Sequence, residues 1–340
     1  MLNELLKRLE AGYGLSRGEA EDVMEELLAG RMNDDDIVRL LEALRSKGET
    51  VEELVGFATA MRRRASITFA RVTAHAEALV DTCGTGGGAA RTFNISTAAS
   101  FVVAGAGVRV AKHGNRSYTT SCGSADVLEA LGVRIDGPPE NAGAAIDEIG
   151  IGFFFAPAAH TAARHAAAAR KRVGAATVFN LLGPLTNPAG ARAQVLGVFA
   201  AKWTEPMALA LAELGTCRAF VVHADDGLDE IALSCSTQVS EVHGRSVQTY
   251  CVQPEDFGVS RAPVDALAGG NAEQNARIVL DVLDGARGPR RDVVIANASA
   301  ALVAAGRASD FREGAALAAQ AIDSGAAREK LEALINFTRR

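Results

Sequence analysis

The sequence predicts a small all-helical unit followed by a large α/β domain with a parallel central sheet flanked by helices. Two observations predict this fold class. The first 65 residues carry only helix signals, whereas from about residue 78 short runs rich in Val, Ile and Phe alternate with alanine-rich stretches. Such runs with helices between them are typical of a parallel sheet covered on both faces.

The helical unit is punctuated at both ends of its helices. Ser16 and Thr50 are each followed three residues later by Glu, which is the capping-box pattern. Gly30 and Gly48 stand where helices are expected to end.

The predicted sheet strands follow in chain order. Buried strands are expected at 78–83, 108–112, 152–156, 195–199 and 220–223, and two strands of alternating polarity at 239–243 and 247–252. Four helices, at 271–286, 292–305, 311–324 and 326–337, carry alternating charge and are expected to form the outer layer of this domain.

Composition narrows the function classes. With 340 residues, 48% of them hydrophobic, the chain can bury a full core, and its longest apolar runs are too short or too rich in alanine to span a bilayer. A net charge of −6 argues against a nucleic-acid surface. Five scattered cysteines without a Cys-x-x-Cys pair predict neither a disulfide framework nor a zinc site. We therefore expect a cytoplasmic protein that binds neither nucleic acid nor a membrane.

Two segments predict a ligand site. The strand at 78–83 runs into a loop with four glycines in five residues, and Asn94, Ser96 and Thr97 follow at a helix start. The strand at 108–112 ends on Lys112-His113-Gly114-Asn115-Arg116-Ser117. Glycine-rich backbone N–H groups bind phosphates, and ligands of such sheets gather at the carboxyl ends of strands. The two segments therefore predict one pocket for a densely anionic, hydroxyl-rich ligand.

Other glycine motifs fit less well. A Walker loop needs a lysine at its end, and none follows Gly88. A dinucleotide fingerprint is nominally present as Gly84-x-Gly86-x-x-Ala89, but the next helix is expected to start only near Ser96, and Arg109 stands where a ribose-binding acid belongs. A flexible turn without a ligand does not need the polar residues that follow the loop.

The chain resembles one family, the anthranilate phosphoribosyltransferases. The resemblance covers nearly the whole chain and rests on motifs in the family's order: 81–87 with its Gly-Thr-Gly-Gly, 94–97, 112–117, 123–132, 154–157, 177–188 and 222–230.

The resemblance implies a fold class and an organisation. The α/β fold would have a small split all-helical domain and a large α/β domain with a mostly parallel central sheet flanked by helices. The helical domain would comprise 1–70 with a return segment at about 164–190, and the phosphoribosyl-binding domain 75–163 and 191–340. A homodimer through the helical domain is also implied.

The resemblance further implies an activity. The family transfers the phosphoribosyl group of phosphoribosyl pyrophosphate (PRPP) to the amine of anthranilate, in tryptophan biosynthesis. Charge neutralisation and alignment are then the principal catalytic tasks, because positive charge develops on the ribose and negative charge on the leaving pyrophosphate.

Carried over by position, the resemblance assigns site residues. Lys112, Asp229 and Glu230 would be catalytic, and Asp229, Glu230 and Ser96 would hold Mg²⁺, with two ions per subunit expected. The PRPP contacts would be Gly84, Thr85, Gly86, Gly87, Gly88, Thr92, Asn94, Ile95, Ser96, Thr97, Lys112, His113, Gly114, Asn115, Arg116, Thr119, Thr120 and Ser124. The anthranilate contacts would be Gly84, His113, Asn115, His160, Arg170, Gly183 and Pro184.

Three positions depart from the family. Gly88 replaces the usual Asp, Ser121 replaces the usual Lys, and Thr161 follows His160 in place of Pro. These changes leave the metal dependence and the acceptor range open. Two alternatives also stay open: a phosphoribosyltransferase or phosphorylase of the same fold with another acceptor, and a non-catalytic nucleic-acid-binding paralogue.

Overall fold

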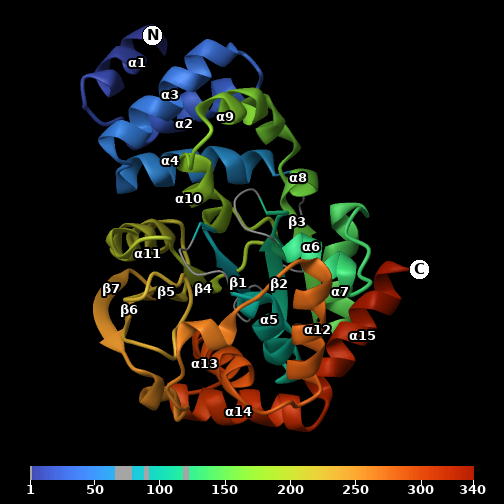
Figure 1. Cartoon of the computed structure of the whole chain (residues 1–340). Helices are drawn as coiled ribbons and strands as arrows, with labels where there is room; N and C mark the ends of the chain where they lie inside the picture. Colours follow the sequence, from blue (N-terminus) through green and yellow to red (C-terminus); the bar gives the residue numbers. More distant parts are fainter. Residues whose placement is uncertain (1, 66–78, 88–91, 118–121) are drawn as a thin grey trace.

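The computed structural model describes residues 2–65, 79–87, 92–117 and 122–340. Two lobes are visible in Figure 1, a helical lobe at the top that contains the N-terminus and an α/β lobe below it. The predicted fold class is confirmed. Among the described residues, no helix is long and apolar enough to cross a membrane.

The helical lobe begins with four helices: α1 (Leu2–Glu10), α2 (Arg17–Leu28), α3 (Asp34–Lys47) and α4 (Val51–Arg64). Both predicted capping boxes are confirmed, since the side chains of Ser16 and Thr50 accept hydrogen bonds from the backbone N–H three residues on. Gly30 and Gly48 have φ of 69° and 86°, a region that glycine enters without strain. Both therefore lie at helix ends, as predicted.

A later segment returns to this lobe. After the third strand come α8 (Ala156–Ala159), a 3₁₀ turn (Thr161–Ala166), α9 (Ala167–Val173) and α10 (Val178–Leu185). Helix α9 packs on α3 and α10 packs on α4. The Arg62 guanidinium donates from Nε to the carbonyl oxygen of Leu185 over 2.8 Å, which ties the end of α4 to the end of α10.

Seven strands of the described chain form one sheet in the order β3-β2-β1-β4-β5-β6-β7. All pairs from β3 to β5 are parallel, and the pairs β5–β6 and β6–β7 are antiparallel. The strands are β1 (Leu79–Gly84), β2 (Arg109–Gly114), β3 (Ile151–Phe155), β4 (Ala193–Gly197), β5 (Arg218–Ala224), β6 (Thr237–His243) and β7 (Ser246–Val252). The alternating polarity of β6 and β7 therefore belongs to the antiparallel edge, where one face meets solvent.

Neighbouring residues of the central strands face different cores. Val195 and Phe220 pack in a core with α5 (Ile95–Gly105), whereas Leu196 and Val221 pack in a second core with α11 (Thr204–Glu213). Helices α6 (Ser124–Ala130) and α12 (Ala272–Leu283) join the first core, and α7 (Pro139–Ile149) covers β3. The sheet is thus covered on both faces because successive side chains point to opposite sides.

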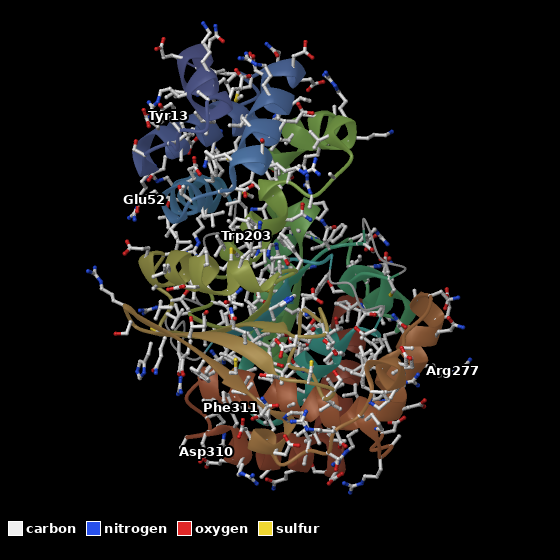
Figure 2. The ribbon with its side chains drawn as sticks, turned by 60° about the vertical axis from the view of Figure 1, so that its left-hand side comes forward. Tyr13, Glu52, Trp203, Arg277, Asp310 and Phe311 are labelled. Carbon is white, nitrogen blue, oxygen red and sulfur yellow. The ribbon has the colours of Figure 1, made fainter. Side chains whose placement is uncertain are left out.

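The last helices include one correction. Helices α14 (Phe311–Asp323) and α15 (Ala326–Thr338) lie on the outside as expected, but α13 (Pro289–Ala304) is buried almost throughout between the sheet and α14. Its segment from Val293 to Ala304, apolar except for Asn297 and Ser299, explains this position. Figure 2 shows Asp310 and Phe311 at the start of α14, where the Phe311 ring lies 5.2 Å from that of Phe220.

Candidate active site

The glycine loop begins at the carboxyl end of β1. The N–H of Thr85 donates to the carbonyl oxygen of Gly197 over 2.9 Å, and the Thr85 hydroxyl accepts from the N–H of Phe199 over 3.1 Å. Gly86 and Gly87 have φ of 65° and 84°, which a side chain would strain. The loop is therefore anchored to β4 while its glycines stay exposed. Gly88 lies outside the described residues.

The loop leads to the N-terminus of α5. Asn94 is the N-cap residue, but its side chain does not accept a hydrogen bond from the first turn. The hydroxyl of Thr97 is buried without a partner among the described residues. Ile95 is buried, and Ser96 is partly exposed. Because the N–H groups and the dipole of a helix N-terminus favour an anion, this turn suits a phosphate.

Lys112 and His113 are held at the end of β2 by a buried network. The Asp81 carboxylate accepts from the backbone N–H of His113 over 3.1 Å and from the Asn187 amide over 2.8 Å. The Lys112 ammonium donates to the carbonyl oxygen of Thr82 over 2.6 Å. Burial lowers the pKa of Lys112, and the charge of Asp81 opposes this shift. The cation is therefore fixed beside the glycine loop.

The predicted acidic pair lies next to both elements. A Cβ at Gly84 would stand 3.4 Å from an Asp229 carboxylate oxygen, so Asp229 borders the glycine loop. Glu230 faces the N–H and hydroxyl of Ser96, and Lys112 is close enough to act on its charge. The structure thus brings Ser96, Asp229 and Glu230 together.

The charges of this pair are not balanced. Burial and, to a smaller extent, the charge of Asp229 raise the pKa of Glu230 to about 8, although Lys112 and Ser96 oppose the shift. Burial also raises the pKa of Asp229. Two carboxylates that resist ionisation and one hydroxyl are hard oxygen donors of the kind that Mg²⁺ prefers. Among the described residues, no group of three or more His, Cys, Asp or Glu side chains is placed to hold a metal ion.

The raised pKa of Glu230 predicts how the stability of the metal-free protein depends on pH. Between its ordinary value of 4.5 and about 8, the folded state keeps a proton that the unfolded state has lost. The free energy of unfolding should therefore fall as pH rises through this window, and Glu230→Gln should fall less. Denaturant unfolding with a chelator at pH 5 and pH 8 measures the difference. Parallel pH profiles for the two proteins would show that Glu230 ionises normally.

Two imidazoles lie between the sheet and α10. The rings of His113 and His160 are 5.2 Å apart edge to face. Burial lowers the pKa of His113 to about 3 and that of His160 to about 4, and the backbone of Gly183 and Thr186, respectively, opposes the shift. Each Nε2 is buried without a hydrogen-bond partner among the described residues. Both rings are therefore neutral near pH 7.

Arg170, Gly183 and Pro184 come from the segment that returns to the helical lobe. The Arg170 guanidinium, in the last turn of α9, stacks 5.1 Å above the ring of Phe179 in α10. In the described part of the chain, no atom beyond its own helical turn lies within 4 Å of where a Cβ would stand at Gly183. The backbone of Gly183 also lies close enough to His113 to act on its ring.

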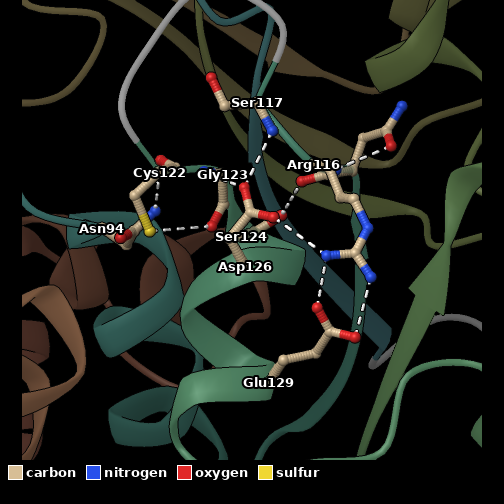
Figure 3. Close-up of polar contacts among 9 residues, drawn as sticks. Asn94, Arg116, Ser117, Cys122, Gly123, Ser124, Asp126 and Glu129 are labelled. Carbon is tan, nitrogen blue, oxygen red and sulfur yellow. Dashed lines mark hydrogen bonds and ion pairs between the residues drawn. The ribbon is translucent and has the colours of Figure 1, made fainter. Parts of the chain in front are cut away.

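The segment after β2 is bound to α6, as Figure 3 shows. The Arg116 guanidinium pairs with Asp126 and Glu129, and the N–H groups of Ser117 and Gly123 donate to the Asp126 carboxylate over 3.1 and 2.8 Å. Arg116 is thus directed toward α6, and a role on phosphate would require it to leave two acids.

The other predicted residues of this segment lie close together. Ser124 donates to the carbonyl oxygen of Asn115, and a Cβ at Gly114 would meet the Ser124 hydroxyl at 2.1 Å. Thr92 forms a bridge with Ala268. Thr119 and Thr120 lie outside the described residues, as does Ser121.

Sequence reasoning missed three residues that shape the site. Asp81 and Asn187 are hydrogen-bonded to each other and hold the Lys112 segment at the N–H of His113 and the carbonyl oxygen of Ala111. Gly197 lets Asp229 approach β4, since a Cβ there would stand 1.7 Å from the Asp229 carbonyl oxygen. An acid inside a predicted buried strand was the available signal for Asp81. No local pattern marks Gly197. A glycine is required there only because Asp229, 32 residues later in the sequence, packs against it.

Comparison of the sequence with family models identifies related proteins. Residues 3–65 match the helical bundle domain of the glycosyl transferase family, and residues 76–328 match its a/b domain. The chain therefore belongs to this family of glycosyl transferases.

Individual relatives narrow the family. An anthranilate phosphoribosyltransferase from Desulfosudis oleivorans is 54% identical over 340 residues, which cover 100% of this chain and 99% of the relative. The solved enzyme of that name from Thermus thermophilus matches with a TM-score of 0.91 at 44% identity over 99% of each chain. The enzyme from Saccharomyces cerevisiae in complex with PRPP and Mg has a TM-score of 0.88 at 26% identity over 99% of this chain and 98% of that one. The chain belongs to the anthranilate phosphoribosyltransferases.

Proposed function

We propose that this chain transfers the phosphoribosyl group of PRPP to the amine of anthranilate, giving N-(5-phosphoribosyl)anthranilate and pyrophosphate in tryptophan biosynthesis. One observation carries the proposal beyond family membership. The glycine loop, the first turn of α5, Lys112 and the acidic pair converge at one edge of the sheet, and His113 and His160 join this edge to the helical lobe. An anionic donor and an aromatic acceptor can therefore bind next to each other.

The proposed chemistry assigns work to these residues. Exposed glycine N–H groups, the N–H groups of α5 and the Lys112 ammonium would stabilise the negative charge that develops on pyrophosphate. Binding both substrates at one edge would align the amine with the ribose carbon. The neutral rings of His113 and His160 would border the acceptor without adding charge to a buried space. No side-chain nucleophile is needed.

Magnesium is part of the proposal. Ser96, Asp229 and Glu230 would hold it, and when bound it supplies positive charge for the pyrophosphate oxygens. The yeast relative binds PRPP and Mg, which supports the assignment for this chain. Two ions per subunit stay a prediction.

An assay that follows one substrate and one product tests the function. We expect the fluorescence of anthranilate to fall when PRPP and magnesium are both present, and pyrophosphate to appear in equal amount. Omission of either PRPP or magnesium should abolish both signals. Fluorescence that stays constant in the complete mixture would overturn the proposed reaction.

The carboxylate of anthranilate provides a second prediction. Arg170→Ala should raise the KM for anthranilate about 10- to 100-fold, because a charge-assisted hydrogen bond contributes roughly 1.5–3 kcal/mol. The Kd for PRPP should change little, since the lost contact belongs to one substrate. Steady-state kinetics and calorimetric PRPP titration measure the two effects.

Arg172→Ala is the matched control on the same helix. Arg172 pairs with the exposed Asp35 over 2.8 Å at the surface, so its loss should alter neither constant. Equal weakening of both substrates by Arg170→Ala would place Arg170 on phosphate or in the fold.

Organisation and assembly also belong to the proposal. We propose the division into 1–70 with 164–190 and 75–163 with 191–340, which the packing of α9 and α10 on α3 and α4 supports. A homodimer through the helical lobe and a cytoplasmic location stay predictions. The relatives described above are all anthranilate phosphoribosyltransferases, so a phosphorylase and a nucleic-acid-binding paralogue are not favoured.

A further inference from the structure

Two asparagines outside the predicted site are buried almost completely. Asn275 in α12 is 1% exposed, and Asn297 in α13 is 2% exposed. A buried amide costs free energy unless its donors and acceptor are satisfied, so its partners show what it holds in place. The partners of Asn275 and Asn297 lie in two different segments of the site.

Asn275 is bonded to the residue that starts α5. Its amide nitrogen donates to the side-chain oxygen of Asn94 over 3.0 Å, and its own oxygen accepts from the N–H of Gly270 over 2.7 Å. Asn94 in turn donates to the carbonyl oxygen of Cys122 over 3.2 Å, a bond drawn in Figure 3. These bonds join the loop before α12, the start of α5 and the segment before α6.

This arrangement decides what Asn94 presents to a ligand. An asparagine amide has two N–H hydrogens, and one of them is already donated to Cys122. Because Asn275 occupies the oxygen of Asn94, the amide plane is fixed and the remaining hydrogen has one direction. Asn94 also makes no side-chain cap on the first turn of α5, where the N–H of Ser96 faces Glu230 instead.

Asn297 holds the segment of the acidic pair in a different way. Its side-chain oxygen accepts from the N–H of Ile231 over 3.0 Å, and its amide nitrogen donates to the carbonyl oxygen of the same residue over 3.0 Å. A further bond of 2.9 Å runs to the carbonyl oxygen of Val293 in its own helix. Ile231 directly follows Glu230, so both polar groups of the adjoining peptide units are fixed to α13.

We propose that Asn275 and Asn297 are positioning residues, the first for the phosphate-binding turn at Asn94 and the second for the metal-binding pair Asp229 and Glu230. This inference rests on the proposed function of the site. It predicts that loss of Asn275 weakens PRPP binding at saturating magnesium, whereas loss of Asn297 shifts the magnesium requirement. Neither side chain touches a reacting atom.

The experiment compares Asn275→Ala with Asn297→Ala in the full chain. PRPP binding is measured by calorimetry at a series of magnesium concentrations, without turnover. The series gives the Kd for PRPP at saturating magnesium. It also gives the magnesium midpoint, which is the magnesium concentration at which PRPP binding reaches half of its full strength. We expect Asn275→Ala to raise that Kd about tenfold and to leave the midpoint in place. Asn297→Ala should raise the midpoint about 10- to 100-fold, the usual effect of losing a residue that orients metal ligands.

Two further variants separate positioning from loss of fold. Ser299→Ala removes a buried hydrogen bond on α13 that points to the carbonyl oxygen of Phe311, away from the site, and should change neither constant. Asn297→Asp is nearly isosteric and, when protonated, restores one donor toward Ile231. Its magnesium midpoint should approach that of the wild type at low pH and rise as the carboxyl ionises. Thermal unfolding of each variant gives the accompanying loss of stability.

The possible outcomes are distinct. Equal changes in both constants for both asparagine variants, or changes no larger than those of Ser299→Ala, would overturn the inference and leave a structural role. Glu230→Gln serves as the reference for the proposed function. If Glu230→Gln and Asn297→Ala both leave the magnesium midpoint unchanged, the assignment of the metal site is wrong. If Glu230→Gln shifts the midpoint and Asn297→Ala does not, only the positioning role fails.

Discussion

Replacing Glu230 with Gln should lower kcat on the order of 100-fold or more, equivalent to about 3 kcal/mol of transition-state stabilisation. The reason is that the amide keeps the shape of the side chain but loses the charge that would bind magnesium beside the leaving pyrophosphate. The metal-free variant should unfold at a denaturant concentration no lower than the wild type at pH 8, because burial opposes ionisation of Glu230 in the native state. Activity and stability should therefore move in different directions.

The matched control is Asp225→Asn, which neutralises an exposed acid five residues earlier in the same connection. It should leave kcat within about twofold, since a solvated charge contributes little. Steady-state rates at saturating magnesium and both substrates decide the matter. Full turnover by Glu230→Gln would remove the acidic pair from the mechanism.

Gly197→Ala should cost activity through the same pair without touching its charges. The added Cβ would stand 1.7 Å from the carbonyl oxygen of Asp229 and 2.7 Å from its carbonyl carbon. Both are backbone atoms, so the segment that carries Asp229 and Glu230 has to shift. A displacement of this kind lowers kcat on the order of 100-fold, and overpacking costs about 1–3 kcal/mol of stability.

Gly18→Ala tests whether any added methyl has this effect. Gly18 lies in α2, and in the described part of the chain no atom beyond its own helical turn comes within 4 Å of the new Cβ. Here we expect unchanged kinetics and a gain of about 0.5–1 kcal/mol, because alanine is the better helix former. Rates and denaturant midpoints for both variants provide the comparison. Wild-type kcat in Gly197→Ala would mean that the Asp229 segment can move without consequence.

Local patterns determined the elements of this fold. Capping boxes at Ser16 and Thr50 predicted helix starts, and the short apolar runs predicted every strand of the sheet to within about two residues at most ends. These signals succeed because caps and side-chain periodicity depend on a few neighbouring residues. The buried position of α13 was not predicted, because it depends on how the sheet, α13 and α14 pack on one another.

The sequence also predicted which residues form the candidate site. The glycine loop and the Lys112 segment were placed together because the carboxyl ends of parallel strands share one edge. Family resemblance added Asp229, Glu230 and Arg170, whose local context alone describes solvated charges. The structure places Asp229 beside Gly84, and Glu230 where both Ser96 and Lys112 act on it.

What only the tertiary structure decided is how these groups are held and charged. Asp81 and Asn187 support Lys112 from residues 106 positions apart, and Asn275 reaches Asn94 across 181 positions. The pKa of Glu230 rises to about 8 because the folded chain removes water from it, and the same removal keeps His113 and His160 neutral. Contacts between distant residues and the exclusion of water exist only once the chain has folded, so the sequence predicts candidate site residues while the fold sets their charges and positions.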